Sequence, residues 1–201
     1  MIVSIDPDFP GPHHVHRVAR VIRGGGIVAY PTDTNYGLGC LVTLRESVER
    51  LYRVKHVDPS KPMSLVCNSF EMVSRFAVIE NGAYRILRRT LPGPYTFVLR
   101  ATGETPKRML TRQKTIGIRI PRHAFCLALT EDLGTPLIST TAQIGEDETL
   151  YDPGTLDDRY EGALDLVVDG GILPAEPSTV VDLTSGVPVV VRLGKGPIDL
   201  I

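Results

Sequence analysis

The 201-residue sequence contains no tryptophan, only three cysteines and few aromatic residues, which make up 6% of the chain. The cysteines, Cys40, Cys67 and Cys126, lie far apart in apolar stretches, and no two of them form a CxxC pair. Their odd number and their spacing argue against a disulfide framework. We therefore expect three buried thiols in a reducing compartment.

The chain also lacks long apolar runs and an excess of charge of one sign. No stretch approaches the ~20 apolar residues that a membrane helix needs, and Met1–His16 has no apolar segment like that of a signal peptide. We therefore expect a soluble, cytoplasmic protein without a membrane partner. The net charge is −1, so the overall charge does not indicate nucleic acid binding. Because no Gly-, Ser- or Pro-rich linker separates two apolar regions, we predict one domain over residues 1–201.

Common catalytic and phosphate-binding motifs are missing as well. The sequence contains neither GxxxxGKS/T nor GxGxxG, so neither of the usual phosphate-binding loops is present. The absence of HExxH and GxSxG argues against zinc catalysis and hydrolytic triads. His13, His14 and His16 form a small cluster without an acidic or cysteine partner nearby in the sequence. We interpret this cluster as the exposed face of a helix start rather than as a metal site.

What the sequence does contain is an early alternation of helix-like and strand-like segments. Apolar spacing and capping residues predict helices at Val15–Arg23, Arg45–Val54, Ser69–Phe76, Asn81–Thr90, Pro106–Leu110 and Ala124–Leu133. Ser69 or Asn68 is expected to cap the third of these, and Asn81 the fourth. Apolar, β-branched runs predict strands at Ile27–Tyr30, Met63–Cys67, Tyr95–Ala101, Thr115–Ile120, Leu137–Thr141, Leu166–Val168, Thr179–Leu183 and Val187–Val191. Because the last strands have no helices between them, we predict an α/β fold on a mixed sheet that is parallel in part.

The stretch Gly24–Cys40 combines a strand, a polar turn and a second apolar piece. We expect the hydroxyls and the carboxylate of the turn, Thr32–Asn35, to face outward at a strand end, where open α/β sheets bind ligands. Gly37 and Gly39 are expected to leave the adjacent surface free of Cβ atoms, so that a small molecule can lie against the backbone. An ordinary Asx-rich turn without a ligand is the alternative, and spacing alone does not decide between the two.

Five polar segments fall at or just beyond predicted strand ends, and such ends tend to converge on one cleft. They are residues 32–35, 55–61, 119–123, 139–143 and 177–182. These segments and Arg192 supply cations (Lys55, Lys61, Arg119, Arg122, Arg192) and hydroxyls (Ser139, Thr140, Thr141, Ser178, Thr179), with Asp33 and Asp182 as the carboxylates. Fixed cations among hydroxyls are typical of a phosphate or other anion site. For any one of these residues, a solvated surface position is the alternative.

Six motifs follow one another along most of the chain, from about Val15 to Gly196. They are YPTDTNYGLG (Tyr30–Gly39), VKHVDPSKPMSLVC (Val54–Cys67), LPGPYTFVL (Leu91–Leu99), TIGIRIP (Thr115–Pro121), ISTTAQ (Ile138–Gln143) and PSTVVD (Pro177–Asp182). In this order they resemble the YrdC/YciO family, the threonylcarbamoyl-AMP synthases that make the precursor of threonylcarbamoyladenosine in tRNA. The resemblance implies a twisted, open α/β sheet with helices on its faces and a basic concave cleft.

The resemblance also implies roles for residues at matching positions. L-threonine would be held by Thr34, Arg119 and Ser178, with Arg119 binding its carboxylate through two contacts. The nucleotide would be lined by Lys55, Lys61, Thr115, Thr141, Gln143 and Arg192, with Lys55 and Thr141 at the catalytic positions. In the family's reaction, L-threonine, bicarbonate or carbon dioxide, and ATP give threonylcarbamoyl-AMP and pyrophosphate. Mg²⁺ is expected on the phosphates, and no protein side chain is expected to bind a metal.

This chain departs from the family pattern at two places. The KxR pattern reads Lys55-His56-Val57, so an apolar side chain replaces the arginine, and the SAN pattern reads Thr141-Ala142-Gln143. Loss of a guanidinium that faces phosphate costs ~2–4 kcal/mol of transition-state stabilisation, or about two to three orders of magnitude in rate. A missing KxR arginine is typical of the YciO-like branch. We therefore expect a nucleotidyltransferase that makes threonylcarbamoyl-AMP weakly or acts on a related adenylate.

A second interpretation is a protein that binds tRNA or other double-stranded RNA without synthase activity. Basic residues are in excess across residues 50–122, and acidic residues gather near residues 146–161. Against it, tryptophan is absent and no aromatic pair typical of RNA recognition is evident. A third interpretation is an inactive family member retained for protein contacts. No pattern in the sequence predicts the oligomeric state.

Overall fold

A computed structural model describes the chain except for residues 59–60, 108–110, 112, 145–147 and 161. Within the described residues the helices are α1 (Pro12–Arg23), α2 (Arg45–Lys55), α3 (Phe70–Phe76), α4 (Asn81–Thr90), α5 (Ala124–Leu133) and α6 (Pro153–Arg159), with a 3-10 helix, η2, at Ile198–Leu200. The strands are β1 (Ile2–Ser4), β2 (Val28–Tyr30), β3 (Gly37–Leu41), β4 (Ser64–Val66), β5 (Tyr95–Arg100), β6 (Thr115–Arg119), β7 (Leu137–Thr141), β8 (Gln143–Ile144), β9 (Glu148–Thr149), β10 (Leu166–Asp169), β11 (Thr179–Asp182) and β12 (Val189–Arg192).

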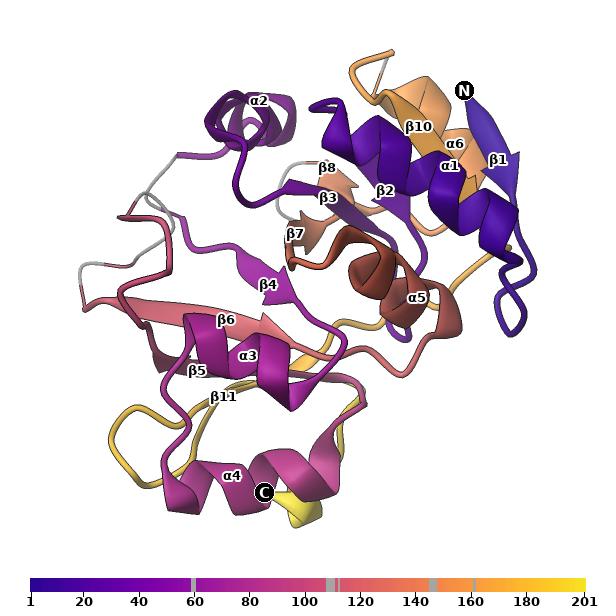
Figure 1. The fold of residues 1–201 in the computed structure, drawn as a ribbon. Coiled ribbons are helices and arrows are strands. Elements are labelled where there is room, and N and C mark those ends of the chain that lie inside the picture. The colour runs from indigo at the N-terminus through magenta and orange to yellow at the C-terminus, as the bar shows by residue number, and fades with distance from the viewer. Residues whose placement is uncertain (59–60, 108–110, 112, 145–147, 161) are drawn as a thin grey trace.

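Most of these strands form one twisted sheet, which runs through the molecule (Figure 1). Its ten strands follow the order β1-β10-β2-β3-β7-β4-β6-β5-β11-β12, while β8 and β9 pair separately. The pairs β4–β6 and β5–β11 are parallel, whereas β3–β7, β4–β7 and β5–β6 are antiparallel. The predicted α/β fold on a twisted, open, mixed sheet is therefore confirmed.

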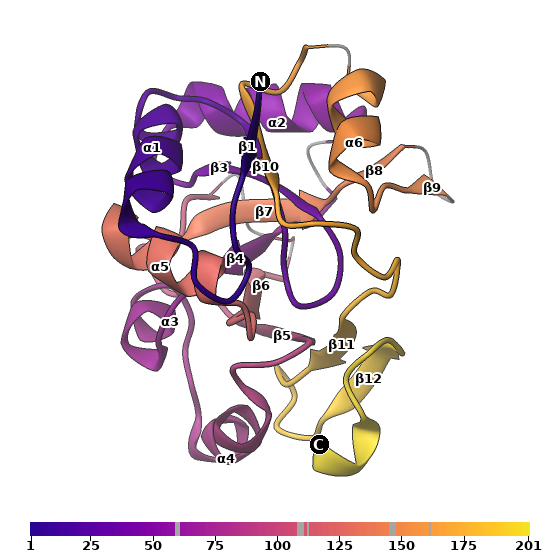
Figure 2. The ribbon, with the colours of Figure 1, turned by 90° about the vertical axis from the view of Figure 1, so that its right-hand side faces the viewer.

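Helices α1 and α5 lie side by side over one part of this sheet (Figures 1 and 2). In α1 the apolar residues recur at helical spacing, so that Val15, Val18, Ala19 and Ile22 are all buried on one side of the helix. They belong to a core cluster with Phe125 of α5 and with residues of β2, β4, β7 and β10.

A larger core cluster covers the opposite face of the sheet and takes in apolar residues of α2, α3, α4 and α6. The alternation of strand residues separates the two clusters. In β4, Leu65 belongs to the larger cluster and Val66 to the cluster under α1 and α5. In β5, Tyr95, Phe97 and Leu99 all face the larger cluster.

The face that carries α1 and α5 continues beyond these two helices. Leu137 of β7 lies in the cluster under them. Ser139 and Thr141, two and four residues further along the same strand, share its side of the sheet and line a cavity instead. The fold therefore leaves one part of a sheet face open, and that part carries polar residues.

Local predictions were confirmed at several helix ends and wrong at others. Ser69, and not Asn68, caps α3, because its hydroxyl accepts a hydrogen bond from the Met72 amide at 3.2 Å. Asn81 does not cap α4, since Glu80 occupies the N-cap position and Asn81 is the first helical residue. The short helix predicted at 106–110 lies partly outside the described residues.

Helix α6 and strands β1, β8 and β9 were not predicted. They are short, and in α6 the buried apolar signal consists only of Pro153 and Leu156. The three cysteines are buried, as expected, and burial raises the pKa of the Cys40 and Cys67 thiols to about 12. His16 does have an acidic partner, because its Nδ1 contacts the carboxylate of Asp132, which is distant in the sequence.

Candidate functional site

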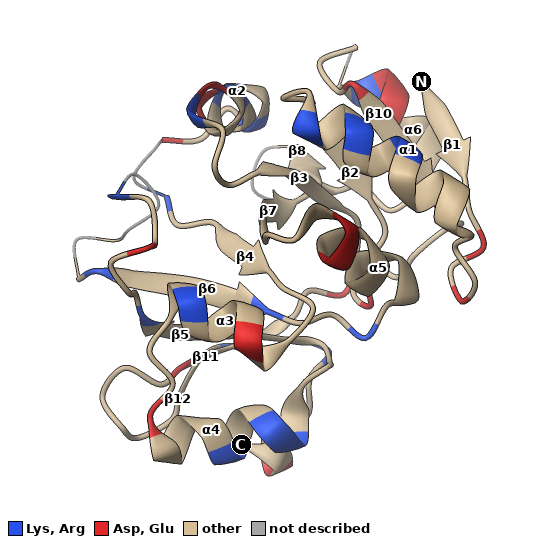
Figure 3. Cartoon of the chain, viewed as in Figure 1, with Lys and Arg blue, Asp and Glu red and all other residues tan. Residues whose placement is uncertain are grey.

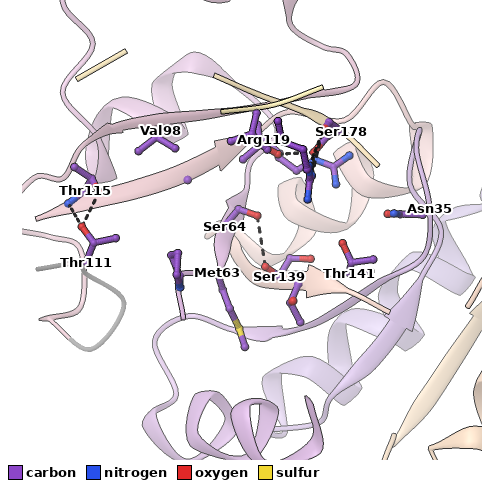
Figure 4. A pocket seen from close by; sticks show the side chains of 17 residues that line it. Asn35, Met63, Ser64, Val98, Thr111, Thr115, Arg119, Ser139, Thr141 and Ser178 are labelled. Atoms are coloured by element: carbon purple, nitrogen blue, oxygen red, sulfur yellow. Dashed lines mark hydrogen bonds between the residues drawn. The ribbon is translucent and has the colours of Figure 1, made fainter. Parts of the chain in front are cut away.

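A cavity of about 320 Å³, here called the sheet cavity, lies over the open part of the sheet face (Figure 4). Its lining comes from β3, β4, β5, β6, β7, β11 and β12 and from adjoining loops. The lining residues are Asn35, Gly37, Pro62, Met63, Ser64, Thr96, Val98, Thr111, Thr115, Gly117, Arg119, Ser139, Thr140, Thr141, Ser178, Val180 and Arg192. They are rich in hydroxyls and include two arginines, and there is no carboxylate among these described residues.

Arg119, at the end of β6, provides the buried positive charge at one end of the sheet cavity. Its Nη2 atom lies 3.0 Å from the Asp33 carboxylate and donates a hydrogen bond to the Thr34 hydroxyl at 2.9 Å. The second carboxylate oxygen of Asp33 accepts from the Arg122 amide at 2.9 Å. Arg119 Nε is buried and makes no hydrogen bond within the described residues. Asp33 and Thr34 therefore fix the position of the guanidinium, and its Nε remains a donor without a partner among the described residues.

Ser178 and Arg192 lie at the same end of the sheet cavity and contact each other. Arg192 Nη2 donates to the Ser178 carbonyl at 2.9 Å and to its hydroxyl at 3.2 Å. The Ser178 hydroxyl also lies 2.8 Å from the hydroxyl of Thr96 on β5. Burial and the nearby charge of Arg119 lower the pKa of Arg192. The positive charges of Arg119 and Arg192 repel each other, so an anion bound near both guanidiniums would be stabilised.

The opposite end of the sheet cavity carries hydroxyls without charge. Thr111 and Thr115 lie there, and their hydroxyl oxygens are 2.6 Å apart (Figure 4). The apolar side chains of Val98 and Val180 also line the cavity. Gly117 has no side chain and contributes bare backbone to the lining. A Cβ atom at this position would lie only 3.2 Å from the Ser64 Cβ, which favours glycine here. A flat, neutral group can lie against this part of the lining.

A second cavity of about 310 Å³, here called the lysine cavity, adjoins the first and shares Pro62, Met63 and Thr140 with it. Its remaining lining residues are Lys55, Val57, Lys61 and Gln143. These four also line an outer cavity of about 660 Å³, together with Arg53, Val54, His56, Ile144, Arg159, Tyr160 and Ala163. The three cavities thus form one continuous series of spaces along the protein.

Lys55 sits where the lysine cavity meets the outer cavity. Its Nζ donates a hydrogen bond to the Gln143 carbonyl. Burial, together with the positive charge of Lys61, lowers the pKa of Lys55 to about 8. The side chain is therefore a cation whose charge depends on pH just above neutrality.

The structure brings nearly all of the predicted site residues together. Thr115, Arg119, Thr141, Ser178 and Arg192 line the sheet cavity. Lys55, Lys61 and Gln143 line the adjoining lysine cavity. Thr34 is not among the described lining residues, because its buried hydroxyl is turned to Arg119. The roles implied for these residues in binding threonine and nucleotide stay predictions.

The location of the site differs from what the sequence predicted. Strand-end loops do contribute, but strand residues on the open sheet face form the floor, and Asp182 lies outside the lining of all three cavities. Asp182 instead accepts hydrogen bonds from the amide and hydroxyl of Thr184 at 2.8 and 2.6 Å. Arg122, one of the predicted cations, also lies outside the lining, and its Nε donates to the Pro92 carbonyl at 3.2 Å.

The turn Thr32–Asn35 does not face outward as expected. Thr32, Thr34 and Asn35 are each at most 2% exposed. The Thr32 hydroxyl donates to the Asn35 carbonyl at 2.6 Å and accepts from the amides of Thr34 and Asn35. The Thr32 hydroxyl thus satisfies polar groups within the turn, Asp33 and Thr34 hold Arg119, and Asn35 lines the sheet cavity.

Of the two glycines expected to leave open backbone, only Gly37 lines the sheet cavity. A Cβ atom at Gly39 would lie 2.8 Å from the Tyr30 ring. Gly39 is therefore required for the packing of Tyr30, whose hydroxyl in turn donates to the Ser139 hydroxyl at 2.5 Å.

Three polar lining residues were not identified from the sequence: Ser64, Thr96 and Thr111. Strand alternation could have indicated Thr96, because it lies between the apolar residues Tyr95 and Phe97 and thus on the other side of β5. Ser64 and Thr111 carry no comparable local signal.

The reaction that the resemblance implies uses Mg²⁺, an ion that prefers carboxylate and other oxygen ligands. The described lining of the three cavities offers hydroxyl, amide and carbonyl oxygens but no Asp or Glu. No cluster of three or more His, Cys, Asp or Glu residues suited to a metal occurs in the described part of the chain. Because Mg²⁺ sites in proteins normally include a carboxylate, these residues do not fit a resident magnesium ion.

Within the described residues, no helix combines the length and apolar character needed to cross a membrane.

The chain was compared with known proteins and with solved structures. A family model described as "Telomere recombination", which groups Sua5, YciO and YrdC, matches residues 20–194. YciO of Escherichia coli strain K12 is 38% identical over 196 residues, covering 96% of this chain and 95% of that protein. The threonylcarbamoyl-AMP synthase of Thiobacillus denitrificans is 36% identical over 168 residues, covering 82% of this chain and 88% of the synthase.

Two solved structures resemble this fold throughout the chain. That of E. coli YciO has a TM-score of 0.94 at 37% identity and covers 100% of this chain and 98% of its own. Pyrococcus abyssi Sua5, complexed with L-threonine, has a TM-score of 0.92 at 28% identity. The match covers 99% of this chain and 59% of the Sua5 chain.

Proposed function

The chain belongs to the Sua5/YciO/YrdC family, and on this basis we propose that it binds ATP and L-threonine and, with bicarbonate, forms threonylcarbamoyl-AMP. The product would serve the threonylcarbamoyladenosine modification of tRNA. Relatives at 31–36% identity are named threonylcarbamoyl-AMP synthase, and one related structure contains L-threonine.

The observation that carries the proposal is the series of cavities itself. The buried guanidinium of Arg119 and the guanidinium of Arg192 occupy one end, neutral hydroxyls and apolar side chains the other, and two lysines line the adjoining space. A small carboxylic acid beside Arg119, a nucleoside along the neutral lining and phosphates beside Lys55 and Lys61 match these three regions in charge. Thr34 acts in this arrangement by orienting Arg119.

The proposed reaction has two steps. The amine of L-threonine condenses with bicarbonate and releases water, which leaves a carboxylate on nitrogen. An oxygen of this carboxylate then forms a bond to the α-phosphorus of ATP, while the bond from that phosphorus to the leaving pyrophosphate breaks. The protein contributes by holding the reactants together and by offsetting phosphate charge. We infer that Mg²⁺ enters with the nucleotide, and none of these contributions depends on it.

Val57 is expected to weaken this activity. Its half-buried side chain lines both the lysine cavity and the outer cavity and packs against the larger core cluster. An apolar side chain here leaves the phosphates with Lys55 and Lys61 but without the family's guanidinium. We therefore propose a slow synthase, or one that acts on a related adenylate.

The test is pyrophosphate release from ATP, measured with and without L-threonine and bicarbonate. Turnover that requires both additions supports the proposal, and calorimetry should detect binding of ATP and of L-threonine separately. If neither ligand produces heat, the proposal is wrong.

Binding of tRNA or double-stranded RNA stays a prediction. Figure 3 shows lysine and arginine on α1, α2, α3 and α4, with acidic residues between several of them, and not as one continuous band in that view. A salt-dependent shift of tRNA in a gel, unaffected by ATP, would favour RNA binding over the synthase.

A further inference from the structure

Tyr160, which follows α6, contacts the backbone of a predicted site residue. Its hydroxyl donates to the Gln143 carbonyl at 3.1 Å and accepts from the Gln143 amide at 3.2 Å. The side chain is buried, and burial raises the pKa of the phenol to about 12, so it remains a neutral hydroxyl that can both donate and accept. Gln143 lies immediately after β7 and Ala142, where the chain leaves the sheet. The phenol thus fixes the position of this part of the backbone.

The same Gln143 carbonyl also holds Lys55. Two donors, the Tyr160 hydroxyl and Lys55 Nζ, share one oxygen atom. Both Lys55 and Gln143 line the lysine cavity, and Tyr160 lines the outer cavity beside it. A displacement of the Gln143 carbonyl therefore displaces the ammonium group at the boundary between the two cavities.

We propose that Tyr160 is a positioning residue of the phosphate-binding region, which acts by holding the Gln143 carbonyl and through it the Lys55 ammonium group. This inference rests on the proposed function, since it assigns to Lys55 the task of offsetting phosphate charge. Nothing in the motifs near Lys55 indicates it, because Tyr160 follows a short helix far along the chain.

A second tyrosine provides a matched control. Tyr36 is also buried, and its hydroxyl accepts from the Gly170 amide at 3.0 Å and donates to the Gly171 carbonyl at 2.8 Å. Burial raises the pKa of this phenol to about 12 as well. Tyr36 and Tyr160 therefore make the same kind of double contact with the backbone, but the Tyr36 hydroxyl contacts the loop after β10 and not a cavity cation.

The pH dependence of Lys55 gives a readout that a purely structural role does not change. The charged or titratable residues lining the cavities around Lys55 are Arg53, His56, Lys61, Arg159 and Tyr160, and Arg159 is paired with Glu148 at 2.6 Å. When the carbonyl is no longer held, Lys55 gains freedom to reach water, and its pKa moves up toward the ordinary lysine value.

The experiment compares Tyr160→Phe and Tyr36→Phe with the wild-type protein. For Tyr160→Phe we expect kcat to fall roughly ten- to hundredfold, because a small displacement of a positioned charge slows the chemical step. The KM for L-threonine should change little, and the loss of activity at alkaline pH should move to higher pH. Tyr36→Phe should lose a similar amount of thermal stability without either kinetic change.

A ¹³C NMR titration of the Lys55 side chain makes the result independent of turnover. If wild-type protein shows no threonine-dependent turnover, the proposed function is wrong, while the titration still decides whether Tyr160 controls Lys55. An unchanged Lys55 titration in Tyr160→Phe, with kinetics equal to those of Tyr36→Phe, would overturn the inference.

Discussion

Replacing Val57 with arginine tests whether a missing guanidinium limits this protein. Val57 lines both the lysine cavity and the outer cavity, between Lys55 and Lys61 in the sequence. Its amide donates to the Tyr52 carbonyl at 3.3 Å, a contact that the substitution keeps. An arginine here adds a planar, permanently charged donor beside the expected position of the phosphates.

The size of the effect follows from the charge that the guanidinium would offset. A positioned donor to transition-state charge contributes ~2–4 kcal/mol, which corresponds to a rise of about 30- to 1,000-fold in kcat/KM for ATP. A third cation also disfavours the protonated form of Lys55, so activity should be lost at a lower pH than in the wild-type protein. Removal of a partly buried valine should lower the free energy of unfolding by about 1 kcal/mol.

The assay is threonine-dependent pyrophosphate release as a function of pH, with two control variants. Val57→Met keeps an apolar side chain and should show no gain. Val54→Arg adds the same charge to the outer cavity but not to the lysine cavity, of which Val54 is not a lining residue. A folded Val57→Arg protein that binds ATP without any gain would refute the reasoning, and so would an equal gain from Val54→Arg.

Wild-type activity should fall as the pH rises through about 8, where Lys55 loses its proton, and a pH–rate profile measures this. Because the pKa of Lys55 is lower in the folded than in the unfolded chain, the unfolded state binds more protons between these two values. The free energy of unfolding should therefore rise with pH from about 8 to about 10, and urea titrations of Lys55→Met should lack this contribution to the rise. Arg119→Met leaves the buried Asp33 carboxylate without its ion-pair partner and should lower the free energy of unfolding by ~3–5 kcal/mol; adding Asp33→Asn should restore part of it, and failure to do so would show that the pair is not the cause. Gly39→Ala places a methyl group 2.8 Å from the Tyr30 ring and should cost ~1–3 kcal/mol in thermal unfolding, a cost that Tyr30→Leu in the same chain should reduce.

Local signals in the sequence were sufficient to predict several elements to the residue. Helix α5 and strand β7 have the predicted bounds, Ala124–Leu133 and Leu137–Thr141. Gly134 explains why α5 ends at Leu133, because its φ of 67° lies in the left-handed region that commonly ends a helix. Where the boundary depends on a residue type with a specific backbone preference, the sequence alone is informative.

The candidate site was predicted less completely because its location depends on tertiary structure. The motifs identified residues such as Arg119 and Ser178 correctly as neighbours. They did not indicate that the floor of the cavity is a sheet face, because strand alternation does not show which face a helix will cover. Thr34 illustrates the same difficulty: a polar residue in a turn was expected to be exposed, but Arg119 approaches it from another strand and buries it.

The open sheet face itself is explained by the residues that line it. Thr96 and Ser178 occupy strand and strand-edge positions on the side opposite the larger core cluster, where a covering helix would bury their hydroxyls. The two hydroxyls lie 2.8 Å apart and form a hydrogen bond with each other, and Arg192 donates a further hydrogen bond to the Ser178 hydroxyl. Apolar residues at these positions would favour a helix packed on the face, as α1 and α5 are packed beyond it. Polar residues on this face of the central strands therefore have two effects: they prevent the sheet from being covered, and they leave hydroxyls and guanidiniums facing the space that remains.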